Sequence, residues 1–216
     1  MTRTLLTLTL GVLLLPGMAR EANAGPHGRP LRTGQTTCWD SAGNVIVCAG
    51  TAQDGELRPG LAHVYVDNGN GTITEQKTGL TWEKLSDDGS IHDKDNKYTW
   101  ADAFGKVDDL NTSAFAGFTD WRLPSLFELN TLVNLGNNTR PAVSAVFNTN
   151  CGANSSGNLG CTVTTCSCTV PNFYWSSSTY TEDPQAAWFV YFTVGYDGAN
   201  EKIGQTYARA VRGGGA

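Results

Sequence analysis

Runs of apolar and polar residues predict β-strands in the first and last thirds of the chain, with helices between them. The strongest β signal covers residues 187–192, which are almost entirely apolar and aromatic. Between the runs at 63–66 and 72–74, the Asn68-Gly69 pair favours a hairpin turn, because both residues tolerate positive φ. We expect strands at 36–38, 45–48, 63–66, 72–74, 80–84, 173–177, 187–192 and 206–212.

Two segments in the middle of the chain have helical spacing instead. Thr99 is a good N-cap with Asp102 three residues on, and apolar positions follow on one face at Ala103, Phe104, Val107 and Leu110. A second helix is expected to begin after Ser125, with Glu128 completing a capping box and Gly136 ending the segment. Its predicted buried stripe consists of Leu129, Leu132 and Val133.

This order of elements predicts an α+β fold. Strands, two helices and strands again imply an antiparallel sheet that joins both ends of the domain. Residues 137–172 are rich in Asn, Ser, Thr and Gly, and they contain four of the six cysteines. We expect this stretch to be an irregular loop region stapled by disulfides.

The N-terminus is typical of a secretory signal peptide over residues 1–24. Arg3 precedes a short apolar run at 5–15, and Ala22-Asn23-Ala24 forms a cleavage pattern. A leader with a Cys38–Cys48 hairpin is expected at 25–60, and the main domain at 61–216. No later stretch is apolar enough to span a membrane, so the predicted location is the periplasm, the cell surface or the medium.

Composition excludes some partners. The 216-residue chain carries a formal net charge of −5. A net negative charge argues against a nucleic-acid partner, because proteins gain most of their affinity for nucleic acids by neutralising the phosphates. It also argues against broad attraction to anionic membranes.

The six cysteines point to disulfides, because their number is even and the chain has an export signal. Cys38 and Cys48 flank a turn and are expected to pair. Cys166 and Cys168 lie too close for an unstrained bridge, so each is expected to pair with one of the remaining two, Cys151 and Cys161. A zinc site is the alternative, but the spacing lacks C-x₂-C pairs and a nearby His.

Each candidate for catalysis or metal binding lacks part of its pattern. The turn at 67–71 offers oxygen ligands, but glycines stand where an EF-hand loop needs Asp or Asn. His63 and His92 belong to no catalytic motif, and the serines at 176–178 lack the G-x-S-x-G elbow. Adjacent carboxylates such as Asp87-Asp88 are typical of solvated surface. We therefore expect no enzymatic activity, no cofactor and no metal ion.

The densest motif covers residues 120–128, and we interpret it as structural. Trp121 is expected in the core, and Arg122 is expected to bond a carboxylate or backbone carbonyls. Ser125 and Glu128 would cap the second helix, and Asp120 opens the motif.

Aromatic residues in the last third suggest a ligand surface, because exposed Trp and Tyr rings pack well against the C–H faces of sugars. Arg and Lys side chains could bond hydroxyls or anionic groups nearby. The candidate contact residues are Trp175, Trp188, Tyr191, Lys202 and Arg209.

Six short motifs carry a family resemblance: GQTTC at 34–38, VDNGNGT at 66–72, TGLTW at 78–82, DWRLP at 120–124, YWSS at 174–177 and VRGG at 211–214. Jointly they resemble the Lcl C-terminal domain family of exported bacterial proteins. The resemblance implies a C-type-lectin-like fold, related to sulfatase-modifying factors, and an exported location. Because the family takes its name from a trimeric adhesin, it also implies glycan binding and assembly into homo-oligomers.

These observations favour a non-catalytic, exported binding module for a glycan or extracellular-matrix ligand. A structural or oligomerisation domain of an envelope assembly is the alternative hypothesis. An enzyme that acts on envelope polymers is the third, and it would need converging carboxylates in a concave site.

Overall fold

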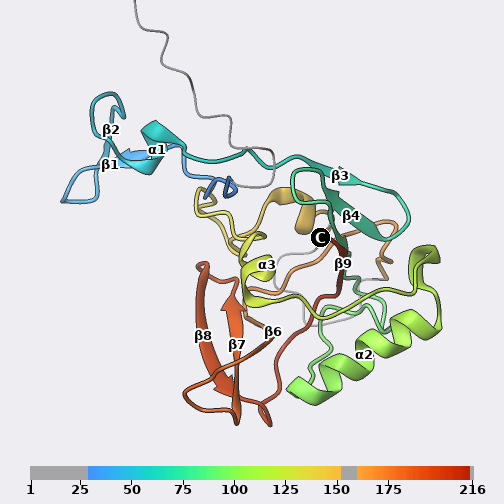
Figure 1. Ribbon diagram of the computed structural model, residues 1–216. Helices are drawn as coiled ribbons and strands as arrows, with labels where there is room; N and C mark the ends of the chain where they lie inside the picture. The colour runs from blue at the N-terminus through green and yellow to red at the C-terminus, as the bar shows by residue number, and fades with distance from the viewer. Residues whose placement is uncertain (1–28, 152–159, 215–216) are drawn as a thin grey trace, which may run out of the picture.

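The computed structural model describes residues 29–151 and 160–214, so the predicted signal peptide lies outside the described residues. The fold is α+β and almost entirely antiparallel in its named strands (Figure 1). The helices are α1 (Asp54–Leu57), α2 (Trp100–Thr112) and α3 (Leu126–Asn130), with 3-10 turns η1 (Phe115–Gly117) and η2 (Ala145–Phe147). The strands are β1 (Cys38–Trp39), β2 (Val45–Ile46), β3 (Tyr65–Asp67), β4 (Thr72–Glu75), β5 (Leu80–Glu83), β6 (Phe173–Thr179), β7 (Ala186–Tyr191), β8 (Tyr196–Glu201) and β9 (Val211–Gly213).

The N-terminal hairpin stands away from the rest of the domain (Figure 1). Strands β1 and β2 pair antiparallel, and the Cys38–Cys48 disulfide joins them with 5.2 Å between the Cα atoms. The Asp40 carboxylate accepts hydrogen bonds from the backbone of Ala42 and Asn44, which closes the turn. The expected hairpin and its disulfide are therefore confirmed. The segment 49–60 after the hairpin contains the single-turn helix α1.

A four-stranded sheet in the order β3-β4-β5-β9 joins both ends of the domain, as predicted. The predicted hairpin turn between β3 and β4 ends at Gly71, whose φ is +91°. A Cβ at this position would lie 2.8 Å from the Val163 side chain and 3.0 Å from the ring of Phe115. Glycine is therefore required both by the backbone conformation and by the packing of the turn.

The expectation of one shared sheet is corrected for the C-terminal strands. Strands β6, β7 and β8 form a separate antiparallel sheet. The predicted strand at 206–212 is reduced to β9, because the chain before it crosses between the two sheets: Thr206 bridges to Tyr98, and Tyr207 bridges to Tyr174. Strand β8 was not predicted, since its sequence is polar and its residues are mostly exposed.

The two expected helices are present. Thr99 caps α2 by accepting from the backbone N–H of Asp102, and a capping box of Ser125 and Glu128 begins α3. Helix α3 ends earlier than expected, at Asn130. Leu132 beyond it is nonetheless buried, because the chain continues as a turn against the same core.

Two hydrophobic clusters lie on opposite faces of the β6–β8 sheet. One contains Tyr174, Val190 and Phe192 with the side chains of β4, β5 and α3. The other contains Trp175 and Phe189 with α2 and Trp121. The C-type-lectin-like comparison remains a prediction. Among the described residues, no helix combines the length and apolarity that a bilayer crossing requires.

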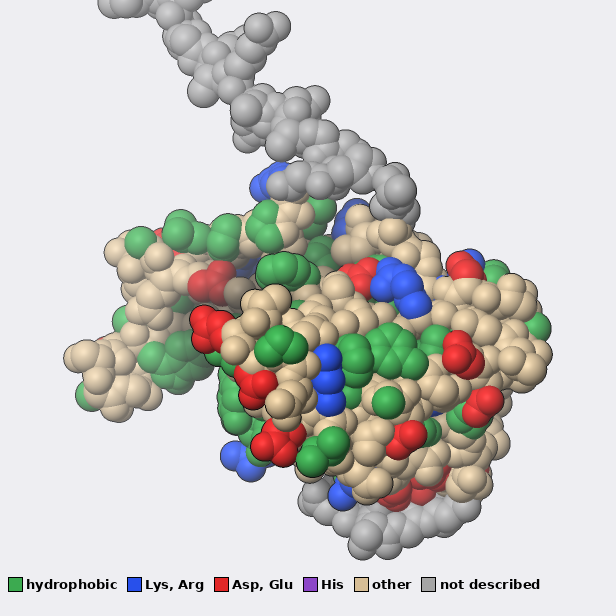
Figure 2. All heavy atoms as spheres, turned by 60° about the horizontal axis from the view of Figure 1, so that its bottom comes forward, with side chains coloured by type: hydrophobic (Ala, Val, Ile, Leu, Met, Phe, Trp, Pro, Cys, Tyr) green, Lys and Arg blue, Asp and Glu red, His purple; other side chains and the backbone are tan. Residues whose placement is uncertain are grey.

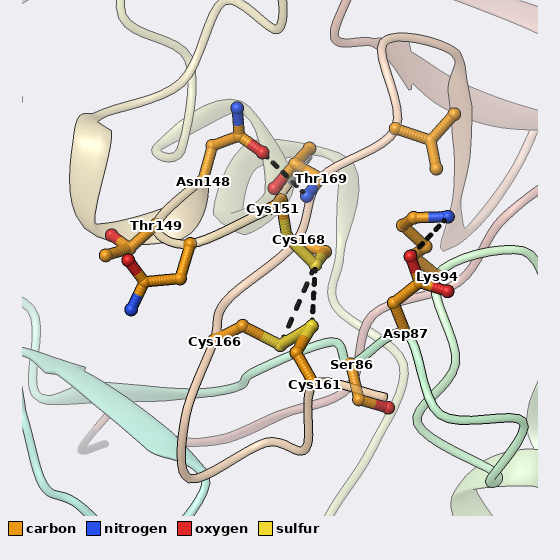
Figure 3. The surroundings of a disulfide bond; sticks show 12 residues. Ser86, Asp87, Lys94, Asn148, Thr149, Cys151, Cys161, Cys166, Cys168 and Thr169 are labelled. Carbon is orange, nitrogen blue, oxygen red and sulfur yellow. Dashed lines mark hydrogen bonds and ion pairs between the residues drawn. A yellow bond between two sulfur atoms is a disulfide. The ribbon is translucent and has the colours of Figure 1, made fainter. Parts of the chain in front are cut away.

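The cysteine-rich region is stapled as expected. Cys168 pairs with Cys151, and Cys166 pairs with Cys161. Figure 3 shows the two bridges side by side, with the sulfur of Cys168 within 4.0 Å of the sulfurs of Cys161 and Cys166. The bridges therefore form one compact cystine cluster, which holds a region of little regular structure.

Candidate functional site

Two of the five expected ligand residues are buried, and those two predictions are wrong. Trp175 is 0% exposed, and its indole N–H donates to the backbone carbonyl of Tyr98. Arg209 is 1% exposed and donates to the carbonyls of Glu83 and Cys168. The reason is that both faces of the β6–β8 sheet are covered, so alternation along β6 does not bring Trp175 to the surface.

The other three residues are half-buried and do not meet. Trp188 and Tyr191 lie three positions apart on β7, so they face opposite sides of the sheet. Trp188 packs edge-on against Tyr180, with 5.1 Å between ring centroids. Tyr191 lies between Phe173 and Tyr196.

Lys202 lies in a third location, apart from both Trp188 and Tyr191. Its ammonium lies 4.0 Å from the ring centroid of Trp100 and donates to the hydroxyl of Thr179. Lys202 pairs with Gln185 at one end of β7, whereas Tyr191 is at the other end, about 20 Å away at strand spacing. The expected residues therefore do not form a single site.

The 120–128 motif acts structurally, as we interpreted it. Trp121 is buried and donates to the carbonyl of Phe115. Arg122 binds the two carboxylate oxygens of Glu128 at 2.7 and 2.5 Å, and the same carboxylate accepts from the N–H of Ser125. Asp120 pairs with Arg212 next to β9. Because helix α3 and the C-terminal strand share these bonds, the motif fixes the helix against the central sheet.

A buried charge cluster at the end of β5 was missed from the sequence. Glu83 is fully buried, and its carboxylate accepts from Lys106 at 2.8 Å and from the backbone of Ala210 at 2.9 Å, with His92 at 2.7 Å. Burial by itself raises the pKa of Glu83, but the Lys106 ammonium and the His92 contact more than compensate and lower it to about 2.

The cations of the cluster are also buried. Burial lowers the pKa of Lys106, and attraction to Glu83 offsets part of that change. Burial likewise lowers the pKa of Arg209. Because Glu83, Lys106 and Arg209 each bond to other parts of the protein, the cluster holds β5, α2 and the C-terminal segment together.

Among the described residues, an uncharged pocket of about 350 Å³ lies between the N-terminal segment and the chain after α3. In Figure 1 this chain, drawn in yellow, lies between the blue N-terminal segment and the upper end of the β7–β8 hairpin. Its lining residues are mostly small or polar: Gly34, Asn134, Gly136, Asn137, Thr139, Pro141, Val143, Ala145 and Asn148. We call it the asparagine pocket.

Tight backbone packing shapes one wall of this pocket. The N–H of Leu135 donates to the carbonyl of Thr33 at 2.7 Å. A Cβ at Gly136 would lie 2.0 Å from the carbonyl oxygen of Gly34, and Gly34 itself has a φ of +89°. Only glycine therefore allows the two segments to approach so closely.

The three asparagine side chains differ in how far the protein satisfies them. Asn137 is fully used: its Nδ2 donates to the carbonyls of Pro141 and Val143, and its Oδ1 accepts from Thr139. Asn134 accepts from Gly136, and Asn148 accepts a long 3.4 Å bond from Thr169. Within residues 29–151 and 160–214, no acceptor lies within bonding distance of the Nδ2 groups of Asn134 and Asn148. Two amide N–H₂ groups are thus available at the pocket.

Apolar surface and the cystine cluster flank the pocket. Leu135 is 41% exposed, and its side chain packs against Gly195 in the β7–β8 turn, one residue before the half-exposed Tyr196. On the other side, Asn148 and Thr169 lie beside the Cys151–Cys168 bridge (Figure 3). The pocket therefore offers amide groups, has an exposed apolar side chain at its rim, and lies next to a disulfide bridge.

Three small antiparallel sheets, two segments held by disulfides and a buried ion cluster define a disulfide-stabilised α+β domain in the described residues. Residues 71–212, about two thirds of the chain, match the Lcl C-terminal domain, and the chain belongs to this family. The predicted family membership is confirmed. No curated protein matches the chain. The disulfides together with the family indicate an extracellular location.

Proposed function

We propose that this domain is a non-catalytic binding module outside the cytoplasm, at the cell envelope or beyond it, and that it binds a neutral glycan in the asparagine pocket. The observation that carries the proposal is the pair of amide groups, on Asn134 and Asn148, that are accessible at an uncharged pocket and donate to no acceptor within the described residues. Amides both donate to and accept from hydroxyl groups, so they suit sugars.

The size and surroundings of the pocket support the same ligand class. A pocket of about 350 Å³ lies at the lower end of the range for small-molecule sites, which fits one or two sugar rings. The apolar rim at Leu135 offers a surface for the C–H face of a sugar. A neutral glycan also fits the acidic chain better than a sulfated one, because like charges repel.

Absence of catalysis is part of the proposal. Among the described residues, the pair that most resembles a catalytic dyad is His92 and Glu83. This supports the proposal, because Lys106 and backbone groups hold the pair inside the domain. Glu83 has no exposed surface and cannot reach a polymer substrate.

The test is a glycan array with the disulfide-intact chain, followed by titration of the hits. Asn148→Ala should weaken binding at least about tenfold, because it removes one hydrogen-bonding group worth more than 1 kcal/mol in a pocket. Asn200→Ala, on the exposed strand β8, is the matched control and should bind as the parent chain does. An array without hits, or an Asn148→Ala variant with unchanged affinity, rules out the proposal.

A second function, assembly through the N-terminal hairpin, is favoured by a separate observation. Val45 and Val47 are 70% and 81% exposed, and Trp39 and Ile46 beside them are also exposed. Figure 2 shows hydrophobic side chains on this lobe, at the left of the view, whereas the face of the body carries scattered charges of both signs. Exposed apolar surface of this kind is typical of a protein contact.

Light scattering tests this second function directly. An oligomer that Val47→Asp converts to monomers would support it, with Ile203→Asp as the control at an equally exposed apolar site on the body. A monomer at all concentrations would exclude it.

A further inference from the structure

The loop between β5 and α2 gathers three carboxylates that no role described so far explains. One carboxylate oxygen each of Asp87, Asp93 and Asp95 lies within 4.8 Å of the others. The backbone forces this convergence: Ser86 and Asp93 form a parallel bridge, with Ser86 donating to His92 and Lys94 donating back to Ser86. The bridge brings the side chain of Asp87 next to the end of the loop.

Asp87 is the residue that indicates a ligand. Its side chain is fully buried, and neither of its carboxylate oxygens accepts a hydrogen bond. One oxygen, Oδ2, has an ion-pair partner in the Lys94 ammonium at 3.3 Å, which Figure 3 shows beside the cystine cluster. The other, Oδ1, has no hydrogen-bond partner among the residues that the structure describes, although a buried carboxylate oxygen without one costs several kcal/mol.

The charges around Asp87 are also unbalanced. Lys94 is shared, because it binds the Asp95 carboxylate at 2.7 Å in addition to Asp87. Asp93 accepts from the backbone of Gly89 and Asp95, which orients its carboxylate without neutralising it. Among the described residues, three carboxylates and the Lys94 ammonium leave two negative charges in excess, which one divalent cation would balance.

We propose that Asp87, Asp93 and Asp95 form a calcium-binding site. Their oxygens lie within 4.8 Å of one another, close enough to share one ion. Ca²⁺ accepts irregular sets of carboxylate and water ligands, whereas Mg²⁺ demands near-ideal octahedral geometry. Half of the Asp95 side chain is exposed, so the site opens to solvent, and water can complete the coordination. The ion would supply Asp87 Oδ1 with the partner that it lacks.

Calcium would stiffen the link between the loop and the cystine cluster. The N–H of Asp87 donates to the carbonyl of Cys161 at 2.9 Å. This single hydrogen bond would link a residue that binds the ion to the cystine cluster. The site does not depend on glycan binding, and its test needs no glycan.

The test is equilibrium binding of Ca²⁺ to the full chain with its disulfides intact, after treatment with a chelator. We expect one Ca²⁺ per chain with a Kd of about 10⁻⁴–10⁻³ M or tighter, as in extracellular modules, a rise in the midpoint of thermal unfolding, and binding of Mg²⁺ at least about tenfold weaker. Asp95→Asn should weaken Ca²⁺ binding at least about tenfold, since it removes a charged ligand.

Asp108→Asn is the control, because Asp108 is exposed on α2 outside the cluster, and it should bind like the parent chain. Asp95 is partly exposed, so its variant keeps the fold even where Asp87→Asn does not. Failure of the parent chain to bind Ca²⁺ at about 10 mM, far above these Kd values, overturns the proposal. Equal Ca²⁺ affinity of the Asp95→Asn and parent chains overturns it as well.

Discussion

Replacing Lys106 with methionine should remove the attraction that keeps Glu83 charged inside the domain. The two side chains are 1% and 0% exposed, and their charged atoms lie 2.8 Å apart. Methionine retains the unbranched apolar stem of lysine, so the packing changes little. Removing one partner of a buried pair leaves an uncompensated charge, which costs about 3–5 kcal/mol of the free energy of unfolding.

The pKa of Glu83 gives an independent magnitude. Its value of about 2 in the folded protein, against 4.5 as the ordinary value, corresponds to about 3 kcal/mol. The pKa of Lys106 moves in the destabilising direction, because burial lowers it. The net gain from the pair is therefore smaller than Glu83 alone indicates, and we expect a loss at the lower end, about 3 kcal/mol.

The loss should also depend on pH, with a defined sign. The folded pKa of Glu83 lies below its unfolded value, so its contribution is complete above pH 4.5 and disappears as the pH falls toward 2. In Lys106→Met the buried carboxyl group is no longer held in its charged form. The difference in stability between the two proteins should therefore shrink on acidification.

Urea unfolding followed by tryptophan fluorescence measures this difference at about pH 7 and about pH 2.5. Lys77→Met, at an exposed position, is the control and should lie within about 0.5 kcal/mol of the parent chain. A loss below about 1 kcal/mol for Lys106→Met at neutral pH would refute the reasoning, and so would an equal loss at both pH values.

Two further variants test the placement of residues that the sequence suggested as ligand contacts or staples. Trp175→Ala should lower the free energy of unfolding by about 3–5 kcal/mol in urea titrations, because it empties a core position; an effect below about 1 kcal/mol would contradict its burial. The double variant Cys38→Ser/Cys48→Ser should leave the free energy of unfolding of the body within about 0.5 kcal/mol of the parent while exposing the hairpin to protease, because the hairpin stands away from the body (Figure 1). Loss of cooperative unfolding in this double variant would show that the hairpin belongs to the core.

Local signals in the sequence were sufficient for helix starts, turns and cystines. Thr99 and Ser125 cap their helices because capping depends on residues within one turn. Cys38 and Cys48 face each other because a short turn separates them. The end of α3 was misjudged, since a buried Leu132 fits a tight turn as well as another turn of helix.

The candidate sites depend on contacts between distant segments, which periodicity does not reveal. The asparagine pocket joins Gly34 to residues 100 or more positions later. Arg209 was expected to contact a ligand, yet its guanidinium donates to the backbone carbonyls of Glu83 and Cys168 inside the domain. Lys106 lies on the same helical face as Ala103 and Val107, and a charged residue on a buried stripe was the one available signal of the ion cluster.

The pairing of β9 with β5 has a consequence for the order in which the domain is made. Trp82 lies opposite Val211, about 130 residues later, so the edge of β5 stays open until nearly all of the domain has been synthesised. Contacts so distant along the chain form slowly. The four-stranded sheet of a growing polypeptide would thus remain incomplete during most of its emergence from the ribosome.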